Sequence, residues 1–189
     1  MGEGIRNKTE LILALLYAGE RPSQFTPVIG ITRLEKLLFL LKTDEGFLAK
    51  APEEDNLNFV PFRMGPWTNE IYDEVDFLES LGLLKKQSQK KRTPADAVHD
   101  DELFSDMILD KYQNTATIAD EETEIFTLSE EGKKKTSEIW ARLSVEEKQR
   151  IMSVKHRFNN MNLKQFLRYV YKKYPEYTTA SEIKDYLNV

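Results

Sequence analysis

The sequence predicts a mainly α-helical protein with a small β wing, which places it in the α+β class. Three observations predict this class. Several segments repeat apolar residues at helical spacing directly after residues that commonly cap helices. The segment 62–84 reads as a turn, a helix and the start of a strand. A second strand is expected over 124–128, so that two strands flank a long connection.

Two helices are predicted in the first part of the chain. Asn7 is expected to cap the first helix, with Glu10 at the reciprocal position of a capping box. Thr32 and Glu35 predict a second capping box. The apolar residues over 34–41 occupy nearly every side of the second helix, so this helix is expected in the middle of a core.

A third helix is predicted after a corner in the chain. Residues 58–64 fit a short edge strand, because the proline in this segment cannot donate within a central strand. Gly65 and Pro66 are expected to make the turn, and Thr68 to cap the helix. Gly82 stands where the end of a helix favours a left-handed residue.

The remaining elements are a strand pair and a series of helices. Ser129 is expected to cap the helix that follows the strand over 124–128. Ser144 predicts a further capping box, Asn162 caps the next helix, and a short helix over 181–187 closes the chain. Three helices followed by a strand, an arm, a strand and a helix give the order of a winged helix-turn-helix domain.

Charge is distributed unevenly along the 189 residues, whose formal net charge is −5. Residues 93–128 hold one basic and ten acidic side chains, whereas residues 129–189 hold 13 basic and eight acidic ones. Such an acidic block is usually a solvated insert; the alternative is an acidic arm that covers a basic surface or docks on a basic partner. We predict a winged-helix-like domain over 1–143 with an acidic insert at 93–124, and a helical C-terminal extension over 144–189 packed on it.

Two segments of the chain resemble a known family. The stretch G-I-T-R-L-E-K-L-L-F-L-L resembles a helix of the YwgA-like and Panacea (SocA-like antitoxin) groups. The stretch F-V-P-F-R-M-G-P-W-T-N-E-I, followed by V-D-F-L-E-S-L-G-L-L, resembles their Gly-Pro segment and the helix end after it. The resemblance covers roughly residues 8–86, and I-F-T-L-S-E-E-G-K adds a similar strand–helix junction.

This resemblance implies a winged-helix-like fold without catalytic activity. Panacea-type members are antitoxins that neutralise by binding a protein, so the resemblance also implies action through protein contacts. Within the shared motif, Gly65 and Pro66 are expected to set the turn and Trp67 to anchor the core. Met64 stands where the family usually has an aromatic residue, and Trp67 replaces a smaller aromatic one.

Composition and motifs exclude several classes of function. The chain has no cysteine, so disulfides and cysteine-rich zinc sites are excluded. The longest apolar run, 37–41, is too short to cross a bilayer, and the first residues lack a signal pattern, so we expect a cytoplasmic protein without membrane contact. His99 with Asp100 and Glu102 fits a solvated loop better than a metal site, and His156 fits the surface of a basic helix. Phosphate-loop and hydrolase motifs are missing, so we expect a non-enzymatic protein without catalytic residues, metal or cofactor.

Duplex DNA is the alternative partner that the fold class suggests. A basic wing and one face of the last long helix could follow phosphates. Those candidate residues are Lys85, Lys86, Lys90, Lys91 and Arg92 in the wing, and Lys164, Arg168 and Lys172 in the helix. The third helix argues against this use, because it carries five carboxylates and no lysine or arginine. Among its outward residues only Asn69 offers the donors that base readout needs.

Protein contacts are therefore the primary functional hypothesis. The chain is predicted to be an interaction module, antitoxin-like or a regulatory adaptor. Asp73 and Asp76 on the third helix are candidate partner-binding residues. Tyr169 and Tyr177 are further candidates, because tyrosine is enriched at interfaces. The partner is either another protein or a second copy of this chain in a homodimer.

Overall fold

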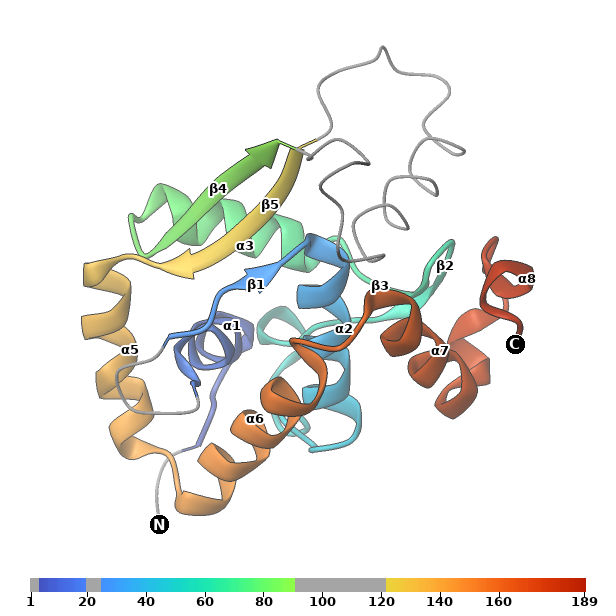
Figure 1. Ribbon diagram of the computed structural model, residues 1–189. Coiled ribbons are helices and arrows are strands. Elements are labelled where there is room, and N and C mark those ends of the chain that lie inside the picture. The colour runs from blue at the N-terminus through green and yellow to red at the C-terminus, as the bar shows by residue number, and fades with distance from the viewer. Residues whose placement is uncertain (1–3, 20–24, 91–121) are drawn as a thin grey trace.

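The computed structural model describes residues 4–19, 25–90 and 122–189 (Figure 1). Most of the acidic insert predicted at 93–124 therefore lies outside the described residues. The same holds for Lys91, Arg92, His99, Asp100 and Glu102. Lys90 is placed through its backbone alone.

The described residues form helices and two small antiparallel sheets, a mixed α/β architecture dominated by helix. The α-helices are α1 (Lys8–Tyr17), α2 (Ile31–Thr43), α3 (Glu70–Ser80), α5 (Glu130–Arg142), α6 (Val145–Phe158), α7 (Leu163–Lys173) and α8 (Lys184–Leu187). The strands are β1 (Val28–Ile29), β2 (Val60–Phe62), β3 (Gly65–Trp67), β4 (Leu84–Lys90) and β5 (Glu122–Leu128). Two short 3-10 helices, η1 (Glu53–Asp55) and η2 (Pro175–Thr178), complete the set. None of the helices in this part of the chain combines the length and apolarity that a bilayer crossing requires.

The larger sheet has the strand order β1-β5-β4, with both pairs antiparallel. Leu84 lies opposite Leu128, and Val28 lies opposite Phe126. All four side chains are buried, whereas Lys85, which points to the other side of β4, is exposed. One face of the sheet therefore packs on the core. Helix α3 lies behind β4 and β5 in Figure 1 and contacts β4.

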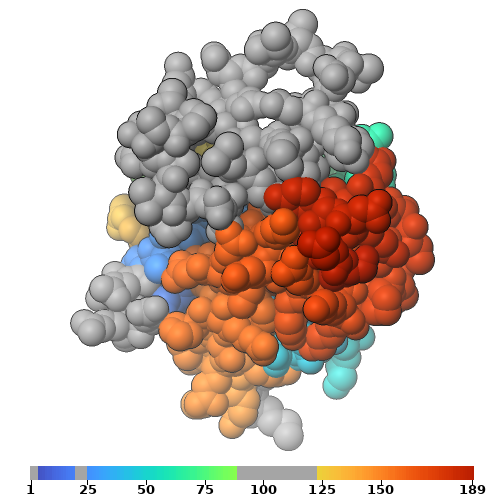
Figure 2. Space-filling model, turned by 45° about the vertical axis from the view of Figure 1, so that its right-hand side comes forward, coloured from blue at the N-terminus to red at the C-terminus, as the bar shows by residue number. Residues whose placement is uncertain are grey.

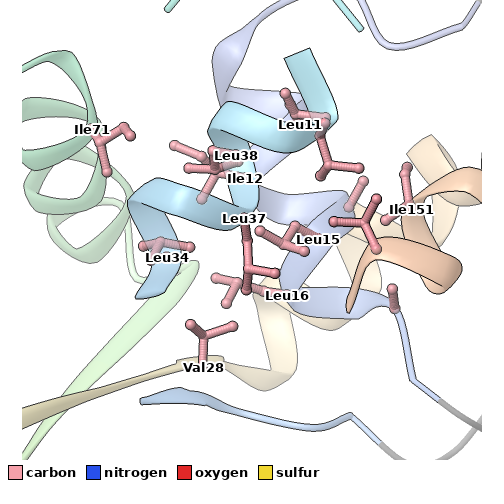
Figure 3. Close-up of a cluster of buried hydrophobic side chains, with 14 of the residues drawn as sticks. Leu11, Ile12, Leu15, Leu16, Val28, Leu34, Leu37, Leu38, Ile71 and Ile151 are labelled. Atoms are coloured by element: carbon pink, nitrogen blue, oxygen red, sulfur yellow. The ribbon is translucent and has the colours of Figure 1, made fainter. Parts of the chain in front are cut away.

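The core is built around α1 and α2. Every residue from Leu11 to Leu16 of α1 is buried, and so is every residue from Arg33 to Leu41 of α2. Figure 3 shows leucine and isoleucine side chains of both helices meeting those of Val28, Ile71 and Ile151. The prediction that the second helix lies in the middle of the core is confirmed.

The segment after residue 144 shares this core. Ile151, Phe158 and Phe166 belong to the same buried cluster as α1 and α2. Arg33 donates from Nη1 to the carbonyl oxygens of Phe158 at 2.9 Å and Met161 at 2.7 Å, which satisfies carbonyls at the end of α6. Figure 2 shows α6, α7 and α8 as one continuous surface.

Several predicted caps are confirmed. The side chains of Asn7, Ser129, Ser144 and Asn162 each accept a backbone N–H of the first helical turn. Ser144 and Glu147 complete a capping box at the start of α6. These motifs are local in sequence, so these four helix starts could be predicted without knowledge of the tertiary structure. Thr68 is predicted to cap α3, but Asn69 holds the cap position of that helix.

The capping box predicted at Thr32 and Glu35 is wrong. Helix α2 begins at Ile31 after Gly30, and no side chain caps it. Glu35 instead turns into the core beside Lys36.

The turn predicted at Gly65 and Pro66 is wrong as well. Both residues lie in β3, and the turn between β2 and β3 is made by Arg63 and Met64. Gly65 has φ of +88°, and a Cβ there would lie 2.9 Å from the ring of Tyr171. Glycine is needed at this position because α7 packs so closely on the hairpin.

Two further expectations concern helix ends. Gly82 has φ of +69° directly after α3, as predicted. Helix α8 begins at Lys184, so the closing helix is shorter than the predicted 181–187. The capping box predicted at Asn7 and Glu10 forms only in part. The Glu10 carboxylate accepts from the backbone N–H of Arg6 at 2.9 Å and not from that of Asn7.

Candidate functional site

Helix α3 divides its residues between the core and solvent. Ile71, Val75 and Leu78 are buried, as the spacing of apolar residues predicts. Glu74 is buried too, and its carboxylate accepts a hydrogen bond from the Thr9 hydroxyl of α1. The five carboxylates of this helix therefore do not act together, since one of them fixes α3 to α1.

The outward side of α3 combines carboxylates with apolar side chains. Asp73 and Asp76 are exposed, in agreement with their helical spacing. Phe77 and Leu81 are each 52% exposed, and Tyr72 is 40% exposed. Burial, followed by the negative charge of nearby Glu35, raises the pKa of Tyr72 to about 12. Its phenol is therefore neutral and can donate a hydrogen bond at physiological pH.

Lys86 on strand β4, a candidate residue of the predicted wing, is already paired with α3. Lys86 lies 2.6 Å from a carboxylate oxygen of Asp76 and 3.0 Å from one of Glu79. The hydrogen bond with Asp76 raises the pKa of Lys86 above its usual value, and Glu79 adds to this effect. The charge of Lys86 is thus compensated within the molecule.

The two described lysines at the start of β4, Lys85 and Lys86, lie on opposite faces of the sheet. Lys86 faces α3, whereas Lys85 is exposed on the other face, on the side of Glu130 and Lys133 of α5. Neighbouring residues of a strand alternate in this way, so Lys85 and Lys86 do not form one basic surface.

Two of the three basic residues predicted on α7 contact α8 and hold it in place. The ammonium group of Lys164 lies 3.9 Å from the ring centroid of Tyr186, and Arg168 donates from Nε to the Leu187 carbonyl at 2.9 Å. Lys172, two turns from Lys164, is exposed. Helix α7 lies on the side of the molecule opposite β4 (Figure 1), so the described basic groups are separated in space.

The two candidate interface tyrosines are partly buried. The ring of Tyr169 packs on Phe158 at 4.8 Å and lies under the guanidinium of Arg157 at 5.1 Å. The ring of Tyr177 packs edge-on against Phe39 at 4.9 Å. Both side chains cover the core on the α7 side of the protein.

A row of aromatic rings extends the α3 surface onto the hairpin β2–β3. Phe62 lies 4.9 Å from Trp67, which lies 6.5 Å from Tyr72. Trp67 is partly exposed rather than a core anchor, and Phe62 is 41% exposed. Phe62, Tyr72, Asp73, Asp76 and Phe77 are hereafter called the acidic–aromatic face. The sequence showed its carboxylates, but the aromatic row arises only when the hairpin folds against α3.

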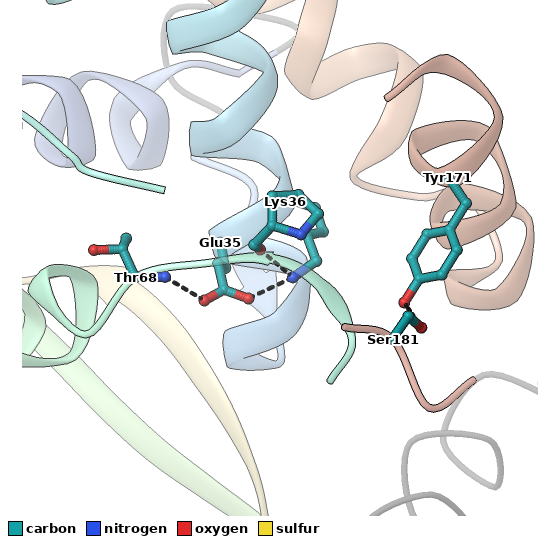
Figure 4. A network of polar contacts seen from close by, with 6 residues as sticks. Glu35, Lys36, Thr68, Tyr171 and Ser181 are labelled. Atoms are coloured by element: carbon teal, nitrogen blue, oxygen red, sulfur yellow. Dashed lines mark hydrogen bonds and ion pairs between the residues drawn. The ribbon is translucent and has the colours of Figure 1, made fainter. Parts of the chain in front are cut away.

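A buried charge network positions this hairpin (Figure 4). Lys36 on α2 donates to the carboxylate of Glu35 at 2.5 Å and to the Pro66 carbonyl at 2.7 Å. Glu35 also accepts from the backbone N–H of Thr68 at 3.4 Å. Burial raises the pKa of Glu35, and the charge of Lys36 opposes that rise. On the other side, the Tyr171 hydroxyl contacts Ser181 at 2.8 Å.

The described residues contain no group of three or more histidine or carboxylate side chains that could hold a metal ion. The acidic–aromatic face offers instead an exposed surface of carboxylates and aromatic rings. Comparison with known proteins gives no match among family models, curated proteins or solved structures.

Proposed function

We propose that this chain is a winged-helix-type interaction module that binds a basic partner protein through the acidic–aromatic face. The order α1, β1, α2, α3, β4, β5 supports this fold type, since the short β1 pairs beside β5 as the first strand of a winged helix does. The hairpin β2–β3 is an insertion between α2 and α3. The resemblance to Panacea-type antitoxins favours an antitoxin-like or adaptor role.

The pairing of Lys86 with Asp76 and Glu79 carries this proposal. A winged helix that binds DNA needs cationic groups on its third helix and wing. Helix α3 has no basic residue, and two of its carboxylates pair with Lys86 of β4. The charge of Lys86 is therefore not available for a phosphate. A carboxylate held about 4 Å from a phosphate costs about 1 kcal/mol even in water, so two such groups would offset about two lysine contacts of similar geometry.

The chemistry of the face indicates the chemistry of its partner. Exposed Asp73 and Asp76 favour a partner surface rich in lysine or arginine. Phe77 and the aromatic row provide the apolar centre that specific interfaces need. Aromatic rings beside carboxylates also suit an arginine side chain, which can stack on a ring and pair with a carboxylate.

Site-directed photocrosslinking in the native host tests this proposal. A photoreactive phenylalanine analogue at Phe77 is expected to give a discrete adduct with a basic protein. The same analogue at Val145, an exposed apolar residue at the start of α6, serves as the control. The Asp73→Lys/Asp76→Lys variant should fold normally and lose the adduct, because the charge reversal repels a basic partner. An adduct that survives this reversal, or that forms equally at Val145, contradicts the proposal.

DNA binding is the competing outcome and has its own assay. On the present proposal, a mobility-shift titration with duplex DNA at low salt stays flat. Binding that weakens steeply with salt and is lost in Lys85→Gln would favour a regulator that uses its wing. An adduct with a second copy of the chain would identify homodimerisation instead.

A further inference from the structure

Lys155 is a buried lysine without an anionic partner among the described residues. Its side chain on α6 is 3% exposed, and its Nζ donates to the carbonyl of Leu16 at 3.1 Å. In the described part of the chain no carboxylate pairs with it, and burial alone lowers its pKa to about 7. Buried lysines are normally paired, so this one calls for an explanation.

One function of Lys155 is clear from its place. Leu16 lies in the last turn of α1, where carbonyl groups lack helical partners and a cation is favoured. That contact uses one of the three N–H groups of the ammonium. The remaining donors have no partner among the described residues, so capping of α1 accounts for only part of the arrangement.

Lys155 also lines a cavity of about 500 Å³ between the end of α1 and α6. This volume lies within the range of about 300–1,000 Å³ that is typical of small-molecule sites. The described lining combines apolar residues such as Met152 with polar ones, among them Gln149, Ser153, Arg157 and Asn160, and it includes no aspartate or glutamate. The charge and polarity of the cavity favour an anion over a cation.

Asn159, which lines the same cavity, carries a second polar group that lacks a hydrogen-bond partner. It follows Lys155 by four residues, so both side chains lie on one side of the helix end. Its amide nitrogen Nδ2 donates to the Pro27 carbonyl at 2.9 Å, which fixes the direction of the amide. Its oxygen Oδ1 is buried and accepts no hydrogen bond within the described structure. The site thus lacks an acceptor for Lys155 and a donor for Asn159.

We propose that this cavity binds a small molecule in which a phosphate or carboxylate group stands next to a hydroxyl group. Lys155 supplies the positive charge for the anionic group, and Asn159 Oδ1 accepts the hydrogen bond of the hydroxyl. A bound water could satisfy Asn159, but a neutral molecule supplies no counter-charge for the protonated form of Lys155.

Glycerol 3-phosphate and glycerate are suitable probes, because one carries a phosphate and the other a carboxylate next to hydroxyl groups. Glycerol, which lacks the anionic group, and inorganic phosphate, which lacks the alcohol hydroxyl, are the matched controls. Binding is followed by NMR of lysine labelled with ¹³C at Cε, at constant ionic strength. We expect at least one probe to bind more tightly than both controls. The apparent pKa of Lys155 should rise by at least about one unit on saturation, which corresponds to about tenfold tighter binding to the protonated form.

Two lysine variants distinguish probe binding in the cavity from nonspecific attraction of the probe to surface charge. Lys155→Met should weaken probe binding by at least about tenfold, whereas Lys172→Met at the exposed end of α7 should leave it within about twofold. Asn159→Ala should remove the advantage of glycerol 3-phosphate over inorganic phosphate. The Lys155 resonance of the unmodified chain tests the proposal even where a variant fails to fold.

Three outcomes would each overturn the proposal. They are absence of probe binding, a Lys155 resonance that does not shift on addition of the probe, and equal affinity of the probe for Lys155→Met and the unmodified chain. Because the Asp73→Lys/Asp76→Lys variant leaves this cavity intact, it should bind the probes normally.

Discussion

The buried ammonium of Lys36 donates to the backbone carbonyl of Pro66 at 2.7 Å, and this bond joins the central helix α2 to the hairpin β2–β3. Lys36 is fully buried and is also paired with Glu35, its neighbour in sequence. The hairpin carries Phe62 of the acidic–aromatic face and Trp67, which packs between Phe62 and Tyr72, so this ion pair positions the hairpin side of the face. The face therefore depends on residues that are inaccessible to any partner.

Lys36→Met is expected to destabilise the protein strongly. The substitution leaves the carboxylate of Glu35 buried without its counter-charge, and breaking a buried pair in this way typically costs about 3–5 kcal/mol. The double variant Glu35→Gln/Lys36→Met should lose less stability than Lys36→Met, because no lone charge remains in the core. Urea unfolding measures both values. A double variant that is less stable than the single one would contradict this account.

Gly65→Ala is expected to cost more stability than Gly46→Ala. Both glycines have positive φ, +88° and +70°, so both variants carry a backbone penalty of about 1 kcal/mol. A Cβ at Gly65 also meets the Tyr171 ring at 2.9 Å, whereas nothing lies within 4 Å of one at Gly46. Thermal unfolding of the two variants compares them directly. Equal losses would show that α7 can move away from the hairpin at no cost.

Local sequence signals predicted the helices because each of those signals acts within one turn. Ser144 with Glu147, and Gly82 at the end of α3, needed no knowledge of distant residues. Thr32 and Glu35 match the same capping pattern, but the Glu35 carboxylate forms a buried ion pair with Lys36 instead of capping the helix. A local pattern could not reveal that competition, since it is decided by the burial of α2.

The candidate surface was predictable only in part, for the same reason. Helical spacing placed Asp73 and Asp76 outward, where the structure has them. The pairing of Lys86 with α3 depends on how β4 lies against that helix, and the aromatic row depends on the fold of the hairpin. Asn159 gave no sequence signal, because its unpartnered oxygen is a feature of tertiary packing alone.

Asp76→Asn is expected to lower the pKa of Lys86 toward the ordinary lysine value while changing stability by less than about 1 kcal/mol. The hydrogen bond with Asp76 is the largest cause of the raised pKa. The Asp76 side chain is 70% exposed, so solvent screens the pair and limits its contribution to stability. NMR titration of ¹³C-labelled lysine reports the pKa, and urea unfolding reports the stability. An unchanged Lys86 pKa would assign the shift to Glu79.

Lys155 is expected to make the folded state more stable as the pH rises above neutrality. Burial lowers the pKa of Lys155 to about 7 in the folded chain, from an ordinary value of 10.5. Between these pH values the unfolded chain binds more protons than the folded one, so this group raises the free energy of unfolding by up to about 1.4 kcal/mol per pH unit. Below pH 7 the group is protonated in both states and adds no slope. Urea unfolding of the unmodified chain and of Lys155→Met across this range isolates the effect, because other titrating groups are common to both. Parallel pH profiles would mean that Lys155 keeps its charge in the folded state, held there by the carbonyl of Leu16.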